Sequence, residues 1–248
     1  YLSNVLAYNF ISDDAFITLR YSQHLAEGHG LVFNLNEHVE GFTSLLWTLL
    51  LSGMSFLGLD LLVAARSFGI LFGLVTIILS YWLASASAGR PIPPLIAGVA
   101  PLMLALNGSF ACWAASGMET MLYVCLVVAS FLSVFSGKLL WSALLVMALL
   151  LTRPEGAAVF ALLGMFQLLQ YPQYKRMHLA MWFVACCGTL ASLFAFRYLY
   201  YGNWLPNTYY AKTGGGFHQV NRGIQYFLEY AADHEGLVVL GALAVFGL

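Results

Sequence analysis

Charged side chains are scarce in this sequence. Lys and Arg together number 10 and Asp and Glu 11, which is 8% of 248 residues, whereas 61% are hydrophobic. A soluble globular domain carries about 25% charged residues, and the mean hydropathy here is +0.81. The composition therefore excludes an ordinary soluble domain and predicts a membrane protein. Because the apolar runs have the length of helices, we expect an all-α polytopic fold.

Motifs that would indicate several other kinds of chemistry are missing. The sequence has no Walker A motif, no dinucleotide-binding glycine fingerprint, no HExxH and no Cys-x-x-Cys pair. Its cysteines follow no metal or disulfide spacing and are Cys112, Cys125, Cys186 and Cys187. The net charge of −1 offers no basic surface for nucleic acid. These absences argue against a nucleotide-borne substrate, a zinc enzyme and a nucleic-acid partner.

Long apolar runs dominate what is present. They predict helices at roughly 61–88, 94–107, 118–136, 139–151, 156–171 and 178–201. A helix that crosses the bilayer needs about 20 residues. Residues 1–11 hold about half of such a span, and residues 237–248 begin another. We therefore expect the chain to be the N-terminal part of a longer protein.

The run 43–58 decides the topology and allows two interpretations, because it is short and Ser52-Gly53 interrupts it. If it crosses the bilayer, Asp13-Asp14 and Arg153-Glu155 lie on opposite sides. If it lies in the interface without crossing, one side receives basic loops that contain no acid, at 89–93, 137–138 and 172–178. The positive-inside rule makes that side cytoplasmic. We favour the second interpretation, because it gathers the polar segments on the extracytoplasmic face.

This topology gives outer loops at about 12–60, 108–118, 152–156 and 202–235, with an amphipathic helix near 13–27 in the first. The densest polar segments are 11–17, 152–156 and 205–212. An ionisable residue near the bilayer is energetically costly, so it is a functional candidate by default.

Acidic residues at helix starts are the candidates for catalysis. Asp13 and Asp14 could merely cap a helix and favour its positive end. As adjacent carboxylates at the membrane surface, one could also act as general base towards a hydroxyl while the other orients it or binds a cation. Glu119 has the same dipole explanation, yet it is predicted on the same face as Asp13. We take all three as catalytic candidates.

Basic residues on the same face are candidates for binding a phosphate. Arg153 and Glu155 flank Pro154 and could form a local ion pair, or Arg153 could face an anionic lipid phosphate, which suits its fork of donors. Lys212 lies beyond the aromatic belt expected at the interface, beside a glycine run. Arg20 and His24 are four residues apart and share a helix face, which is either solvated or turned towards a phosphate.

Four further residues are candidates for a sugar-binding pocket. They are Glu40, Glu155, Tyr209 and Tyr210. Glu40 could simply begin the helix that follows it, and the tyrosines could simply belong to an aromatic belt at the interface.

Five segments together resemble a known family. They are 13–21 (DDAFITLRY), 25–34 (LAEGHGLVFN), 40–47 (EGFTSLLW), 152–156 (TRPEG) and 205–212 (LPNTYYAK). They look like segments of the GT-C glycosyltransferases, and more closely of the branch containing the terminal arabinofuranosyltransferases of mycobacterial cell walls. The resemblance extends over essentially the whole chain. It is specific for the superfamily and weak for the sugar.

The resemblance implies a GT-C-like transmembrane module with juxtamembrane helices in the first outer loop. It implies a bacterial cytoplasmic membrane protein that moves a sugar from a polyprenyl-phosphate donor to a glycan or lipid acceptor on the extracytoplasmic face. Asp13 or Asp14 matches the acidic catalytic position of the family's first loop, and Glu119 more loosely matches a second acid. Some relatives use a divalent cation, and the outer carboxylates could supply oxygen ligands, so the metal is left open.

Two other functions remain possible from the sequence. A transporter or lipid flippase would carry ionisable residues near the midplane of its spans. Arg66 and Arg197 are the only charges well inside the predicted spans, and both can snorkel to the outer edge. A non-catalytic membrane subunit of a glycan-assembly complex would tolerate the loss of the Asp13 and Asp14 carboxylates.

Overall fold

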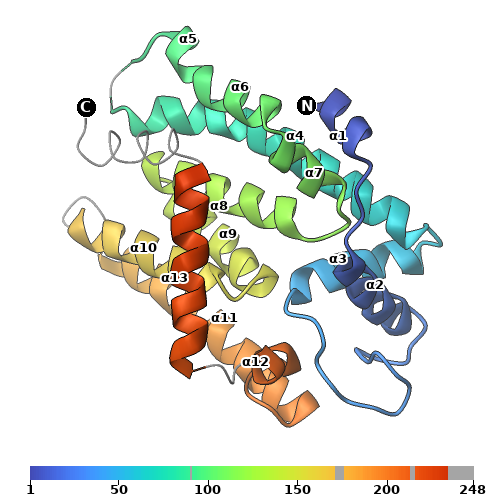
Figure 1. Ribbon diagram of the computed structural model, residues 1–248. Helices are drawn as coiled ribbons and strands as arrows, with labels where there is room; N and C mark the ends of the chain where they lie inside the picture. The colour runs from blue at the N-terminus through green and yellow to red at the C-terminus, as the bar shows by residue number, and fades with distance from the viewer. Residues whose placement is uncertain (90, 171–175, 213–215, 234–248) are drawn as a thin grey trace. The chain divides into compact units, whose positions relative to one another are not determined.

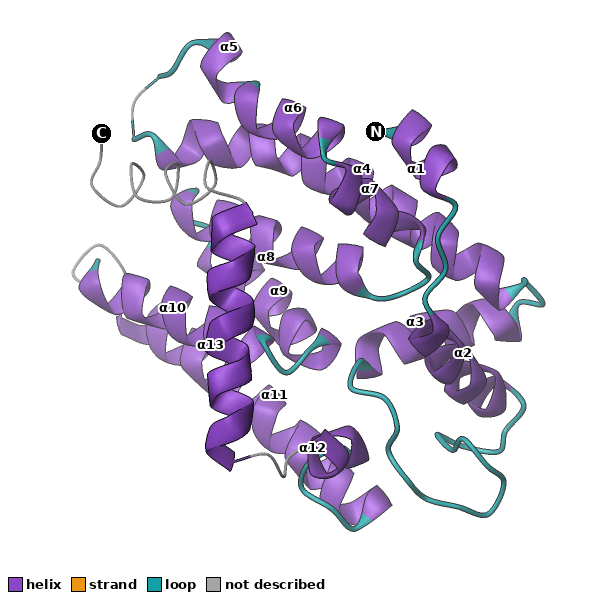
Figure 2. Cartoon of the chain, in the orientation of Figure 1, coloured by secondary structure: helices purple, strands orange, loops and turns teal. Residues whose placement is uncertain are grey.

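A computed structural model describes residues 1–89, 91–170, 176–212 and 216–233 of the chain. These residues form helices and no strands (Figure 2). The helices are α1 Leu2–Tyr8, α2 Asp13–Ala26, α3 Leu45–Phe56, α4 Leu61–Ser87, α5 Pro94–Ala97, α6 Val99–Leu106, α7 Gly108–Ala115, α8 Thr120–Phe135, α9 Leu139–Thr152, α10 Gly156–Leu169, α11 Arg176–Tyr201, α12 Asn207–Lys212 and α13 Gly216–Asp233. The chain divides into two units, Tyr1–Pro206 and Asn207–Leu248, and each is described by itself.

The all-α prediction is confirmed, and each predicted apolar run contains a helix or a pair of helices. Among the described residues, only α4 and α11, with 27 and 26 residues, are long and apolar enough to cross a membrane singly. The segments Pro94–Leu106 and Gly108–Ala115 together meet the same criterion but are bent by 57°. The described residues therefore hold two candidate spans, or three with the bent pair, which supports membrane association.

The predicted outer loop at about 108–118 is largely helical. Asn107 accepts a hydrogen bond from the backbone N–H of Phe110 at 2.7 Å through its side chain, which caps a new helix at Gly108. The resulting α7 packs closely on α4, where a Cβ on Gly69 would overlap the Ala114 carbonyl oxygen. We interpreted this segment as a loop because its cap falls within an apolar stretch that hides the boundary.

Clusters of buried hydrophobic residues join the helices of the first unit, whose arrangement Figure 1 shows. Buried residues of α2, α3, α4, α8 and α9 form one cluster around Trp47, Leu51 and Leu122, and none of these side chains is more than 4% exposed. A second cluster, around Val146, Leu163 and Trp182, joins α8, α9, α10 and α11. The helices α2 and α3 are thus packed onto the bundle and do not stand apart from it.

The second unit contains a strongly amphipathic helix. In α13 the exposed apolar side chains Val220, Ile224, Phe227 and Leu228 recur at helical spacing. Polar and charged residues, including Arg222, occupy the positions between them. This pattern is typical of a helix that lies in the plane of a membrane interface.

Candidate functional site

The turn at residues 116–119 connects three helix ends in the first unit. The backbone N–H of Ser12, immediately before α2, donates to the Ser116 carbonyl oxygen at 3.0 Å. Gly117 has a φ of +79°, and a Cβ placed there would lie 3.2 Å from the Ala15 Cβ. Glycine therefore satisfies both the left-handed backbone and the close approach of α2. As a result the start of α2 lies against the turn that leads into α8.

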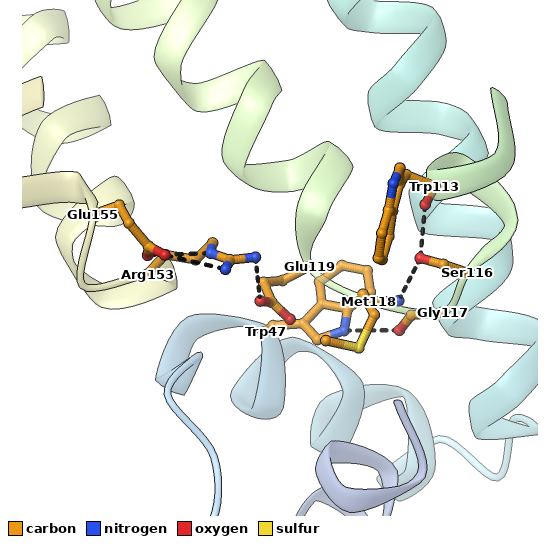
Figure 3. A network of polar contacts seen from close by, with 8 residues as sticks. All are labelled: Trp47, Trp113, Ser116, Gly117, Met118, Glu119, Arg153 and Glu155. Atoms are coloured by element: carbon orange, nitrogen blue, oxygen red, sulfur yellow. Dashed lines mark hydrogen bonds and ion pairs between the residues drawn. The ribbon is translucent and has the colours of Figure 1, made fainter. Parts of the chain in front are cut away.

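Helix α3 is attached to the same turn. The fully buried Trp47 donates its indole N–H to the Gly117 carbonyl oxygen at 3.3 Å (Figure 3). Ser44, which precedes α3, hydrogen-bonds to the Glu119 carboxylate. The start of α3 and the turn that leads into α8 thus form one connected polar region.

Arg153 joins two carboxylates at the end of α9 (Figure 3). Its Nη1 lies 3.2 Å from Glu119 Oε1, and its Nε and Nη2 lie 3.3 and 3.2 Å from the two Glu155 oxygens. The Glu119 side chain is only 4% exposed, whereas those of Arg153 and Glu155 are 32% and 59% exposed. The guanidinium also lies 5.9 Å from the centroid of the Tyr123 ring. The local Arg153–Glu155 pair is confirmed, and Glu119 is a partner that sequence spacing did not predict.

The surroundings of the two carboxylates in this network shift their pKa values in opposite directions. Burial raises the pKa of Glu119 above its ordinary value, and the Glu155 charge adds to this effect, although the Arg153 guanidinium and Ser44 oppose it. Partial burial acts to raise the pKa of Glu155 as well, but the hydrogen bond from Arg153 leaves that pKa below its ordinary value. Glu155 is therefore the stronger acid of the two, and Glu119 is the carboxyl group that more readily holds a proton.

Stability is expected to depend on pH through Glu119. Because the pKa of Glu119 is raised above 4.5, the folded chain binds more protons than the unfolded chain as the pH rises above 4.5. Stability from this group is complete below 4.5 and falls as the pH rises through the raised pKa. Melting temperatures in detergent from about pH 4 to about pH 8 should show this decline, and Glu119→Gln should flatten it. An unchanged slope in the variant would contradict the assignment.

Asp13 and Asp14 occupy the first turn of α2 with exposed side chains. Within the described part of the chain, neither carboxylate pairs with a cation. Both side chains lie at the positive end of the helix dipole. Since Ser12 N–H bonds to Ser116, the Asp pair begins at the same turn that leads to Glu119. The structure thus brings the three predicted catalytic acids to one region, with two free carboxylates and one that is paired.

Glu40 forms a buried ion pair with Arg197, which the sequence analysis does not predict. Its carboxylate accepts from Arg197 Nε at 3.0 Å through both oxygens, and the two side chains are 3% and 5% exposed. Burial raises the pKa of Glu40, and Arg197 opposes that shift. We expected Arg197 to snorkel from its span. The signal available in the sequence was that a charge in an apolar helix requires a partner.

Aromatic side chains at the end of α11 hold the loop that contains Glu40. Tyr200 accepts the Leu31 N–H at 3.1 Å through its hydroxyl oxygen, and the Tyr201 hydroxyl donates to the Leu31 carbonyl at 2.8 Å. His38 packs edge-on against the Tyr200 ring at 5.0 Å between centroids. Glu40 therefore lies inside a firmly packed segment.

Arg20 and His24 differ in exposure although they are one turn apart. Arg20 is exposed, whereas His24 is 3% exposed. The His24 Nδ1 lies 2.9 Å from the Val32 carbonyl oxygen, and its ring meets the edge of His29 at 5.8 Å. The loop after α2 thus encloses His24, and Arg20 alone of this pair is presented at the surface.

The remaining candidates belong to the second unit. Tyr209 and Tyr210 lie in α12, are about half exposed and pack edge to face with centroids 5.7 Å apart. Lys212 is the last residue of α12, and its side chain lies outside the described part of the structure. Their contribution to a common site stays a prediction.

Two further features bear on ligands. Among the described residues, no group of three or more His, Cys, Asp or Glu side chains could hold a metal ion. An apolar groove of about 440 Å³ lies between α3, α9 and α11, lined among others by Leu45, Leu151, Gly188, Leu193 and Phe196. Leu45 follows Ser44, and Leu151 lies two residues before Arg153, so the groove begins beside the polar region.

Comparisons of this chain with models of protein families, with curated proteins and with solved structures found no match.

Proposed function

We propose that this chain is a GT-C-like membrane glycosyltransferase that moves a sugar from a polyprenyl-phosphate donor to an acceptor hydroxyl on the extracytoplasmic face. The observation that carries the proposal is the convergence at the 116–119 turn. The start of α2 with Asp13 and Asp14, the Glu119–Arg153 pair and the beginning of α3 all meet there. Asp13, Asp14, Glu119 and Arg153 are far apart in the sequence, and the sequence alone marks each of them as a candidate.

The groove between α3, α9 and α11 supports a lipid-linked donor. Its walls are almost entirely apolar, with Thr189 and Ser192 as the polar exceptions. A prenyl chain in this groove has its phosphate end near Arg153, because Leu151 lines the groove. Arg153 uses three N–H groups for Glu119 and Glu155, which leaves two of its five donors for a phosphate.

In the proposed reaction, Asp13 or Asp14 takes the proton of the acceptor hydroxyl. The acceptor oxygen then forms a bond to the anomeric carbon while the bond from that carbon to the donor phosphate breaks. The polyprenyl phosphate leaves with the electron pair, and Arg153 stabilises the charge that develops on it. Because phosphate is a good leaving group, the reaction needs no general acid.

Complementation tests the base. Cells lacking the gene are complemented with the full-length wild type, Asp13→Asn or Asp14→Asn, and the envelope glycan is analysed. We expect one of the two variants to lower transfer by about 10²–10⁴-fold, the usual contribution of a general base. Glu27→Gln, at the other end of α2, is the matched control and should restore the glycan at equal membrane levels.

If Asp13→Asn and Asp14→Asn both restored the envelope glycan fully, neither Asp13 nor Asp14 could be the general base. A non-catalytic subunit or a transporter would then account for the chain better. Transfer to acceptor by purified protein with a synthetic polyprenyl-phosphate sugar separates these cases, since neither alternative catalyses that step.

A further inference from the structure

A second cavity lies at the opposite ends of α9 and α11 from the candidate site. It has a volume of about 660 Å³ and is lined by the first half of α9 and the first third of α11. Arg153 follows the other end of α9, and Arg197 lies near the other end of α11. The cavity adjoins the groove described above, because Met147 and Ala185 line both, and the rest of its lining lies towards the other ends of the same two helices.

The walls and the rim of this cavity differ in character. Its walls include Leu140, Trp141, Leu144, Met147 and Met181, and all of these except Met147 are exposed. Trp182 also lines the cavity, and its indole N–H is already hydrogen-bonded, because it donates to Ser142 Oγ at 3.2 Å. The cavity can therefore accept hydrocarbon without leaving a buried polar group unpaired.

One cationic side chain and one imidazole line the end of the cavity where α9 and α11 begin. Lys138 and His178 line it, and both are exposed. No acidic residue occurs between positions 120 and 154 or between 156 and 228, and in the described part of the chain Lys138 has no carboxylate partner. Lys138 also precedes α9 without a side-chain cap, so the positive end of that helix points the same way.

We propose that this cavity binds one phospholipid with an anionic head group. The acyl chain lies against Leu144, Met147 and Met181, and the phosphate lies at Lys138 and His178. The occupant is a lipid and not a protein segment because the charge fits: an apolar trough ends at the Lys138 ammonium, which no acidic residue of the lining neutralises, beside the His178 imidazole. The favoured topology puts this rim on the cytoplasmic side, where the leaflet carries anionic lipid. The lipid proposed here takes no part in the proposed transfer reaction, although its cavity shares Met147 and Ala185 with the groove proposed for the donor.

Photolabelling of the full chain tests the proposal. The protein is reconstituted in nanodiscs of phosphatidylcholine with a trace of a photoactivatable phosphatidylglycerol, and in parallel with a photoactivatable phosphatidylcholine. Wild type should label preferentially with phosphatidylglycerol at peptides from α9 and α11. Lys138→Gln should lower that labelling about fivefold, the effect of one lysine near an anionic surface. Leu144→Trp should lower labelling by both probes, because it fills the trough.

Arg66→Gln is the matched control. It removes a cation in the second turn of α4, where Arg66 bonds to Asn9 and does not line the cavity, and it should leave labelling unchanged. Equal labelling by both probes in wild type, or labelling unaffected by Lys138→Gln, would overturn the proposal. A photoreactive amino acid at Leu144 gives an independent readout. Crosslinks to lipid support the site, and crosslinks to residues 234–248 or to a second copy of the chain overturn it.

Discussion

Replacing Arg197 with Met is expected to lower the free energy of unfolding by about 3–5 kcal/mol. The substitution leaves a shorter, unbranched apolar side chain and removes the charge, so the Glu40 carboxylate stays buried at 3% exposure without a cation. Removing one partner of a buried ion pair costs more than the pair itself contributes, because the other charge loses its compensation. Thermal unfolding in detergent measures the effect.

Two controls identify the cause of that loss. The double variant Glu40→Met/Arg197→Met should recover most of the stability, since apolar side chains often replace a buried ion pair at little cost. Arg66→Met, which removes a partly exposed arginine bonded to Asn9 at 2.7 Å, should cost about 1 kcal/mol. If the double variant were as unstable as Arg197→Met alone, lost packing of the arginine stem would explain the result.

Replacing Arg153 with Gln is expected to lower sugar transfer by about 10²–10³-fold, the usual loss when one group that stabilises a developing charge is removed. It should also destabilise the fold, because Glu119 is left buried with no cation. These two effects have different origins and can be separated. Transfer is measured with purified protein and a polyprenyl-phosphate sugar, and stability by thermal unfolding.

The separation uses Glu119→Gln as the background. The double variant Glu119→Gln/Arg153→Gln carries no buried charge at this position, so its stability should return close to that of Glu119→Gln. Its transfer rate should stay far below that of Glu119→Gln, because the donor phosphate still lacks its cation. Equal transfer rates in these two variants would mean that Arg153 serves only to neutralise Glu119. Glu155→Gln, at an exposed position, should cost less than about 1 kcal/mol.

The helices were predictable from the sequence because their signals are local. The apolar run at 61–88 became α4, and the segment near 13–27 became α2 with its acidic first turn. The helix α7 was missed because Asn107 caps it inside an apolar stretch, where hydropathy alone marks no boundary. The Asn107 side chain, a good helix N-cap, was the informative signal. The expected topology placed a loop at that position instead.

The residues of the candidate site were predictable, but their partners were not. Glu119 and Arg153 were both candidates, yet the bond between them joins positions 34 residues apart. The Glu40–Arg197 pair spans 157 residues. Periodicity reports which face of a helix a residue occupies and carries no information about the partner across the bundle. The exposure of Arg20 and the enclosure of His24 depend in the same way on the path of the loop after α2.

The Glu40–Arg197 pair has a consequence for synthesis on the ribosome. Glu40 emerges 157 residues before the arginine that neutralises it. At typical elongation rates this is a delay of roughly 8–30 s. During that interval the loop around Leu31 and Glu40 lacks α11, which supplies both its counter-charge and the two tyrosines that bond to its backbone. The nascent loop therefore stays hydrated during this interval. Its contacts with Arg197, Tyr200 and Tyr201 form only after α11 has been synthesised.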